Sequence, residues 1–170
     1  LTNYVVIVNS GGNNAYEHDG IRMLPLATIT ELVGLLLDKG HEVVLLGSGV
    51  DINHYQKICA SFPNSSRLFN LAGKLQLAAS SYLIFRSQHF YTTDCGAMHL
   101  GVAANALNNM TAFFGPTNPA HLLPEAYHPY RDSVWCAGES LCSWLTDHRR
   151  SKLCLERRPL SSRRLPEVIL

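Results

Sequence analysis

The sequence has little charge of either sign and almost no excess of one sign. Charged residues make up 16% of the 170 positions, and 14 lysines and arginines stand against 13 aspartates and glutamates, a net charge of +1. This near balance gives no support for a nucleic-acid or polybasic membrane role. Apolar runs are also short, since the run from Leu32 is interrupted by Gly34 and ends at Asp38. Nothing approaches the ~18 residues of a membrane-spanning helix.

A paired-cysteine signature and a leader segment are absent as well. The five cysteines are an odd number, and none of their spacings is Cys-x-x-Cys. The chain begins with Leu1 rather than Met and has no basic, apolar leader, so we expect no secretion signal and expect a fragment or a processed chain. An odd number of cysteines without a secretion signal indicates a reducing compartment, with Cys59 and Cys95 expected to be local structural thiols.

What the sequence does contain is an alternation of strand and helix patterns. At 170 residues, 46% of them hydrophobic, the chain can bury a sizeable core as one unit. Strand patterns occur at residues 4–8, 42–46, 67–71, 89–93, 110–114 and 133–137. Helical patterns occur at residues 26–39, after 51 to about 62, 75–85 and 97–106. This alternation predicts an α/β fold with a Rossmann-like, doubly wound parallel sheet and right-handed crossovers.

Helical spacing indicates which side chains share a face. The segment at 26–39 begins after Pro25, stops at Gly40, and groups Leu32, Leu35 and Leu36. The segment at 75–85 groups Leu75, Ala78, Ala79 and Tyr82. The segment at 97–106 is rich in small residues, so we expect it to press close to the sheet.

A strand, a tight acidic and glycine turn, and a helix follow one another in residues 90–106. Gly96 has no Cβ, so the backbone can turn sharply there and a ligand can approach it closely. The N–H groups that open the helix from about Ala97 have no partner inside it, and with the helix dipole they suit a phosphate. His99 is a further donor for that anion or a partly exposed helix histidine. Asp94 orients the turn, accepts from a ribose hydroxyl, or caps the helix.

Polar turns follow two other strands. Residues 10–14 either let a sugar or phosphate approach the backbone or form an ordinary turn. Gly47 and Gly49 resemble the start of a dinucleotide fingerprint, but the third glycine is missing, so this motif argues against a nicotinamide cofactor. Asp51, which follows, is explained equally well as a helix N-cap or as a residue that binds a ligand.

Residues 94–99 (Asp-Cys-Gly-Ala-Met-His) are followed sixteen residues on by 115–119 (Gly-Pro-Thr-Asn-Pro). They resemble the Asp-[Ser/Thr]-Gly-x-x-His and Gly-Pro-Thr-x-Pro signatures of glycosyltransferase family 9, the ADP-heptose:lipopolysaccharide heptosyltransferases. Four further stretches match this family in order, namely residues 4–8 with Gly11 and Gly12, 22–25, 43–47 with Asp51, and 70–74. The resemblance covers residues 4–119 and only the C-terminal half of such an enzyme.

The resemblance implies one Rossmann-like lobe of a two-lobed (GT-B) glycosyltransferase. Residues 1–148 would be the lobe that binds the donor nucleotide sugar, and the enzyme would transfer a heptose or related sugar from an ADP donor to a lipopolysaccharide-like or other acceptor. Asp51 would take a ribose hydroxyl. The implied donor-binding residues are Arg22, Asp51, Asp94, Cys95, Gly96, His99, Gly115 and Thr117.

Two positions depart from the family pattern. Arg22 stands where lysine is common, and a guanidinium fork is not a point charge, so the phosphate geometry can differ. Cys95 stands where the family has Ser or Thr, so a hydroxyl contact to phosphate is lost while the backbone amide contact survives.

The resemblance also implies what lies outside this chain. The general base that deprotonates the acceptor is expected in the N-terminal lobe of the same enzyme, so we expect the 170 residues alone to be inactive. The family requires no metal for the transfer step, because cationic and backbone groups stabilise the leaving nucleotide. We expect a cytoplasmic location that extends to the inner membrane surface, with neither a nucleic-acid partner nor a transmembrane segment.

The C-terminal region is less regular. Cys136, Cys142, His148 and Cys154 form a loose cluster that would suit zinc or iron, or else unpaired thiols or a disulfide. Residues 149–170 contain six arginines and are expected to be a solvated basic tail that leads into the start of a C-terminal helix.

Two other functions are compatible with the sequence. A non-catalytic Rossmann-like module could use the cysteine cluster and the basic tail for oligomerisation. A lobe of a sugar-nucleotide epimerase could have a similar shape, and it would prefer a uridine nucleotide to an adenosine nucleotide.

Overall fold

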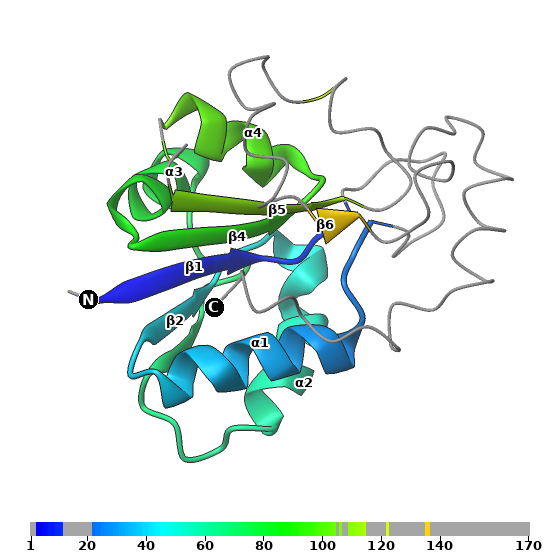
Figure 1. Ribbon diagram of the computed structural model, residues 1–170, viewed down its shortest axis with the longest axis vertical. Coiled ribbons are helices and arrows are strands. Elements are labelled where there is room, and N and C mark those ends of the chain that lie inside the picture. The colour runs from blue at the N-terminus through cyan, green and yellow to red at the C-terminus, as the bar shows by residue number, and fades with distance from the viewer. Residues whose placement is uncertain are drawn as a thin grey trace, which may run out of the picture.

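The computed structural model describes residues 3–11, 22–104, 106, 109–114, 122 and 135–136. Within them, six parallel strands form one sheet in the order β3-β2-β1-β4-β5-β6 (Figure 1). The strands are β1 (Tyr4–Val8), β2 (Glu42–Leu45), β3 (Leu68–Asn70), β4 (His89–Thr93), β5 (Met110–Phe114) and β6 (Trp135–Cys136). The helices are α1 (Leu26–Asp38), the short η1 (Gly49–Asp51), α2 (Ile52–Ala60), α3 (Leu77–Arg86) and α4 (Gly96–Ala103).

Helices cover both faces of this sheet. Figure 1 shows α1 and α2 on one face and α3 and α4 on the other. The central strand β1 gives Val5 and Ile7 to one buried cluster and Val6 and Val8 to the other. A strand covered on both faces needs apolar side chains at successive positions, which explains its unbroken apolar run. The predicted doubly wound parallel sheet is confirmed.

The first helix, α1, begins where predicted, ends one residue earlier at Asp38, and has the predicted buried face. Pro25 occupies its N-cap position, and Gly40 follows its end with a φ of +90° that L side chains rarely adopt. Leu32 and Leu36 are buried, and Leu35 packs against the same cluster. These apolar contacts hold the helix on the sheet.

The fourth helix, α4, lies close to the sheet at Gly101. A Cβ built there would come within 2.7 Å of a ring carbon of Phe90 and 2.9 Å of the Met110 sulfur. The small-residue composition of this helix therefore has the predicted effect of close packing.

The third helix, α3, turns its apolar stripe away from the sheet. Ile84 is buried at 1% exposure, whereas Tyr82 is 63% exposed and Leu75, Ala78 and Ala79 are exposed too. Periodicity finds a stripe but does not say whether that stripe faces the sheet. Here the sheet accepts Ile84, and the predicted group of four residues faces outwards.

Several segments are shorter than predicted. The strands β1, β4 and β5 have the expected bounds, whereas β2 ends at Leu45 and β3 and β6 lie inside the segments 67–71 and 133–137. The helix α4 ends at Ala103 rather than at 106. In the part of the chain that the structure describes, no helix is long and apolar enough to cross a membrane. The expected boundary near 148 and the tail lie outside that part.

Candidate functional site

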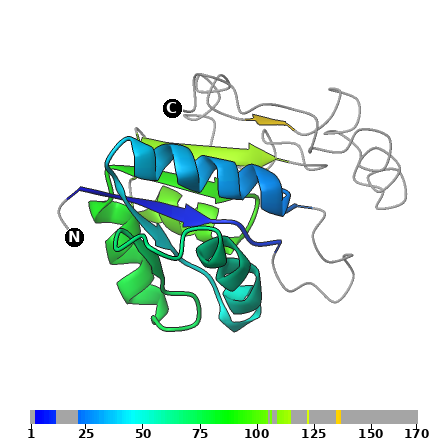
Figure 2. The same ribbon diagram turned by 90° about the horizontal axis from the view of Figure 1, so that it is seen from below.

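The strand order reverses between β1 and β4. The chain builds the sheet outwards from β1 to β3 and then returns to place β4 on the other side of β1. All the strands point the same way (Figure 2), so the loops after β1, β2 and β4 leave the same edge. Ligands of open α/β sheets bind outside the carboxyl ends of the strands where the order reverses.

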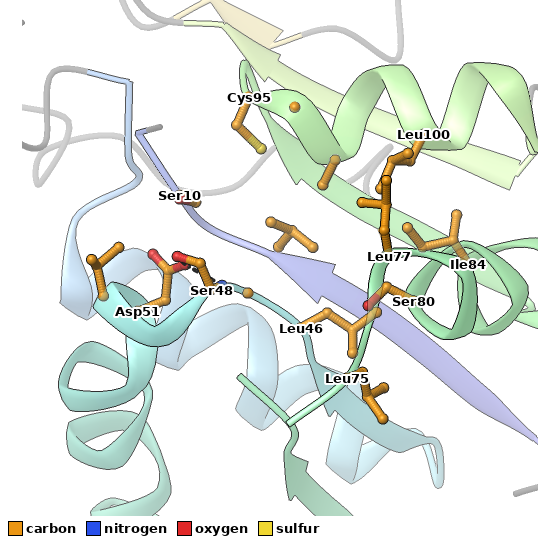
Figure 3. Close-up of a pocket in the computed structure, with 15 residues that line it drawn as sticks. Ser10, Leu46, Ser48, Asp51, Leu75, Leu77, Ser80, Ile84, Cys95 and Leu100 are labelled. Atoms are coloured by element: carbon orange, nitrogen blue, oxygen red, sulfur yellow. Dashed lines mark hydrogen bonds between the residues drawn. The ribbon is translucent and has the colours of Figure 1, made fainter. Parts of the chain in front are cut away.

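A pocket of about 580 Å³ opens at this edge, on the face covered by α3 and α4 (Figure 3). One part of its lining comes from the ends of β1 (Val8, Ser10) and β2 (Leu46–Ser48) and from η1 (Val50, Asp51). The other part comes from the start of α4 (Cys95–Ala97, Leu100) and from α3 with the loop before it (Leu75, Leu77, Ser80, Ile84). Most of these side chains are apolar, and the lining includes one carboxylate. Such a pocket suits a flat apolar group joined to a polar or charged one.

The start of α4 presents backbone donors to the pocket. Cys95 occupies the N-cap position with extended backbone, and its side chain makes no capping hydrogen bond. The Met98 amide donates to the Cys95 carbonyl at 3.0 Å, whereas the amides of Gly96 and Ala97 precede any intrahelical acceptor. A Cβ built on Gly96 would meet nothing within 4 Å. The fold therefore leaves open space beside the Gly96 Cα, at the positive end of the helix dipole.

Asp51 is held by its own turn. Its Oδ2 accepts hydrogen bonds from the Ser48 amide at 2.7 Å and the Ser48 hydroxyl at 2.9 Å. A Cβ built on Gly47 would lie 2.7 Å from the same oxygen, so glycine is required there. The carboxylate is buried yet lines the pocket. Asp51 occupies the N-cap position of α2, but its side chain makes no capping hydrogen bond to that helix and instead accepts from Ser48. The predicted role as a side-chain N-cap is therefore wrong, and the ligand role remains a prediction.

Asp94 pairs with Arg22 instead of capping the helix. The Arg22 guanidinium donates to the Asp94 carbonyl at 3.2 Å, and the same nitrogen lies 3.7 Å from Asp94 Oδ2. The Asp94 side chain is 3% exposed, and its Oδ2 accepts no hydrogen bond from the residues described here. The pair ties the segment before α1 to the turn after β4.

Thr93 fastens the loop after β1 to the end of β4. Its hydroxyl donates to the Ser10 carbonyl at 2.7 Å and accepts from the Ser10 amide at 3.1 Å. The sequence pattern indicates no role for Thr93 beyond its strand, because a threonine at the end of a strand is usual for its β propensity. Its position directly before the acidic turn was the available signal.

Asn9 is the centre of a second buried network that the sequence did not predict. The Asn9 side chain accepts from the Leu24 backbone amide at 2.7 Å and donates to the Leu24 carbonyl at 3.0 Å. The Asn9 backbone amide donates to the Tyr55 hydroxyl at 2.8 Å. Its Nδ2 also lies 3.1 Å from His54 Nε2. Burial lowers the pKa of His54, against the opposing effect of the Asp51 carboxylate, and so favours the neutral ring that can accept this bond.

The structure brings together some of the predicted residues and separates others. Asp51, Cys95 and Gly96 line the pocket, with the Cys95 sulfur 3.7 Å from the Thr92 hydroxyl. Asp94 and Arg22 form the neighbouring pair. His99 is exposed on α4 and is not a lining residue. Gly115 and Thr117 lie outside the described residues.

The possible metal cluster remains a prediction. Cys142, His148 and Cys154 lie outside the described residues, and only the backbone of Cys136 is described, in β6. Among the residues that are described, no three His, Cys, Asp or Glu side chains form a group that would hold a metal ion. Cys59 and Cys95 are free thiols.

The model of glycosyltransferase family 9 (heptosyltransferase) matches residues 24–151. Lipopolysaccharide heptosyltransferase 2 of Escherichia coli (strain K12) is 35% identical over 91 residues, which cover 52% of this chain and 26% of that protein. The match to the family model includes the turn at residues 94–99 and extends well beyond any single motif.

Two solved structures share the fold. The E. coli ADP-heptose lps heptosyltransferase II has a TM-score of 0.65 at 24% identity, covering 94% of this chain and 45% of its own. The second is the dodecameric iron-containing heptosyltransferase TibC in complex with ADP-D-beta-D-heptose. It has a TM-score of 0.55 at 16% identity, and the match covers 94% of this chain and 43% of TibC. This chain thus spans less than half the length of the proteins that it matches.

Proposed function

The chain belongs to glycosyltransferase family 9 (heptosyltransferase), and we propose that it forms the half of such an enzyme that binds the nucleotide-sugar donor. The observation that carries the proposal is the uncapped start of α4, where Cys95 and Gly96 line a largely apolar pocket opposite Asp51. Free amides suit a diphosphate, the carboxylate suits a ribose, and the apolar wall suits a base.

The donor is proposed to be an ADP-activated heptose or a related sugar. The solved structure of TibC is in complex with ADP-D-beta-D-heptose, and its fold is similar to this one. In our proposal the Cys95 and Gly96 amides hold the diphosphate together with the Ala97 amide, with His99, Arg22, Gly115 and Thr117 around it. Arg22 would act partly through Asp94, because its guanidinium already lies against that residue.

The reaction would be transfer of the sugar to a lipopolysaccharide-like acceptor. This half would stabilise negative charge on the leaving nucleoside diphosphate by preorganised amides and cations, without a metal in that step. The general base would come from the other half of the enzyme. We place the enzyme in the cytoplasm at the inner membrane surface, and we expect the 170-residue chain alone to show no turnover; measurable transfer by the purified chain would contradict this.

Calorimetric titration with ADP tests the proposal, with UDP and GDP as controls. We expect selective binding of ADP, weakened about tenfold or more by Gly96→Ala, because a methyl group would occupy the open space beside the Gly96 Cα. His99→Ala should weaken binding less, because its side chain lies outside the pocket lining. Gly34→Ala is the matched control, since the added Cβ would make ordinary contact with Phe62 on another part of the fold.

Each alternative has its own outcome. Preference for UDP would favour an epimerase-like lobe. A chain that is folded by circular dichroism but binds no nucleotide would contradict the proposal. If such a chain also held zinc or iron in a fixed ratio, the oligomerisation module would be favoured instead.

A further inference from the structure

Exposed apolar side chains concentrate on and beside α3. Leu75, Leu77, Tyr82 and Phe85 are four of the six large hydrophobic residues exposed in the described part of the chain, and the exposure of the last three is 67%, 63% and 56%. Ala78 and Ala79, on the same helix, are exposed as well. Single exposed apolar residues are ordinary, but exposed apolar residues that share one side of a helix mark an interaction surface. Ala78, Tyr82 and Phe85 share such a side by their helical spacing, whereas Leu77 lies seven positions before the buried Ile84 and shares its side.

This surface, which we term the α3 face (Leu75, Ala78, Tyr82, Phe85), points away from the side of the helix that buries Ile84. Leu75 and Leu77 belong to the rim of the pocket. The other end of the helix is held near the opposite edge of the sheet, because the hydroxyl of Tyr4, at the start of β1, donates to the Leu83 carbonyl at 2.9 Å. A second lobe that closed over the pocket would contact the Leu77 end and not the Phe85 end.

The charged residues of the stretch that contains α3 have one sign, although the whole chain is almost neutral. No aspartate or glutamate occurs between Asp51 and Asp94. The same stretch contains four cations, of which Lys74 directly precedes the α3 face and Arg86 ends the helix, and both are exposed. The acidic residues of α1, Glu31 and Asp38, lie on the helix layer of the opposite face of the sheet (Figure 1).

We propose that the α3 face docks on a bilayer that contains anionic phospholipid. Tyrosine and phenylalanine are stabilised at the boundary between headgroups and acyl chains, and neighbouring Lys and Arg side chains are attracted by anionic headgroups. A second copy of this chain fits less well, since an α3–α3 contact would bring cations together without an acid to pair them. The arginine-rich segment 149–164 has the same sign of charge and would be repelled.

Docking in this way would place the pocket rim beside the lipid headgroups, since Leu75 belongs to both surfaces. A lipid-anchored acceptor would then meet the donor at the bilayer surface. This last step rests on the proposed function, whereas bilayer binding itself does not.

Sedimentation of the purified 170-residue chain with vesicles tests the proposal. The vesicles are phosphatidylcholine with one third phosphatidylglycerol, and pure phosphatidylcholine is the control. We expect binding to the anionic vesicles that weakens with salt. The double variant Tyr82→Ser/Phe85→Ser should lower the partition coefficient about tenfold or more, through lost apolar contact. Arg86→Gln should lower it about fivefold, equivalent to about 1 kcal/mol per cation.

Leu26→Ser is the matched control, because it removes an exposed apolar side chain from α1. It should bind vesicles like the wild type, and circular dichroism should show that all variants are folded. No binding to anionic vesicles would overturn the proposal. So would unchanged binding by the double variant, which would assign the contact to the arginine-rich segment. A dimer in light scattering that the double variant abolishes would also overturn it, because the face would then join two copies.

Discussion

Two strand-to-helix turns border the pocket, and they are stabilised in different ways. The turn after β2 is complete in itself, because the Asp51 carboxylate accepts from the Ser48 amide and hydroxyl three positions away. The turn after β4 depends on distant groups. Its helix begins without a side-chain cap, and Asp94 pairs with Arg22, 72 positions earlier in the chain. The polar groups of the first turn therefore bond to one another, whereas the second turn leaves backbone amides that another group can bind.

The glycines of the two turns make the same distinction. Gly47 is required by the fold, since a Cβ would collide with Asp51, whereas Gly96 has open space around it and an ordinary backbone conformation. A glycine that the fold does not require is more informative about ligand binding than one that it does require. For this reason we expect the anionic part of a ligand at Gly96 and not at Gly47.

The largest effect should come from separating the pair that supports the second turn. Arg22→Met keeps the length of the side chain but leaves the Asp94 carboxylate buried without its cation. We expect a loss of about 3 kcal/mol in the free energy of unfolding, measured by urea denaturation. Lys39→Met, at an exposed position after α1, is the control and should change stability little. Equal stability of the two variants would show that the second turn does not depend on Arg22.

Lowering the pH should loosen the strand that carries the second turn. Burial lowers the pKa of His89, at the start of β4, to about 4. Because the unfolded chain binds this proton more readily, the contribution of His89 is fully present above about pH 6.5 and is lost as the pH falls towards 4. The loss is about 3 kcal/mol at most, at 1.36 kcal/mol per unit of pKa. The lowered pKa of His54 acts in the same direction.

Urea denaturation as a function of pH, with His89→Phe, measures this effect. The variant keeps a ring against Tyr91, which lies 4.5 Å from the His89 ring between centroids, and should flatten the profile between about pH 6.5 and 4. His41→Gln, at a surface contact with Asn3, should leave the profile unchanged. A wild-type profile that is flat over this interval would show that His89 is not held neutral by burial.

An alanine at each glycine compares the two turns directly. Gly47→Ala should reduce the free energy of unfolding by about 2 kcal/mol, because the backbone or Asp51 must move to admit the methyl group. Gly96→Ala should change stability by less than about 0.5 kcal/mol while it weakens binding of ADP. Thermal and urea unfolding measure the first quantity and calorimetry the second. The same stability loss in both variants would remove the distinction between the turns.

The smallest effect concerns the clamp beside the second turn. Thr93→Val preserves the shape of the side chain and removes both hydrogen bonds to Ser10. We expect a stability loss of about 1 kcal/mol, together with weaker ADP binding because the loop that lines the pocket is released. Thr30→Val, which loses one exposed bond to the Leu26 carbonyl, is the matched control. If both variants bound ADP equally, Ser10 would not need to be held in place for binding.

Most of the fold was predictable because its signals are local. Continuous apolar runs identified β1, β4 and β5 with their bounds, and Pro25 and Gly40 marked the limits of α1. The shorter ends of β3 and α4 were not predictable, because strand pairing and packing on the sheet decide where a regular backbone stops. The candidate site was partly predictable for the same reason, since Asp51, Cys95 and Gly96 directly follow strands or open helices.

The sequence by itself determined the fold class, the family resemblance and the two turns, because each depends on residues within a few positions of one another. Only the tertiary structure decided that α3 presents Tyr82 to the outside, that Arg22 lies against Asp94, and that Thr93 holds Ser10. These contacts join segments separated by up to 83 positions. They exist because the strand order brings β1 and β4 together, and local patterns do not record which strands become neighbours.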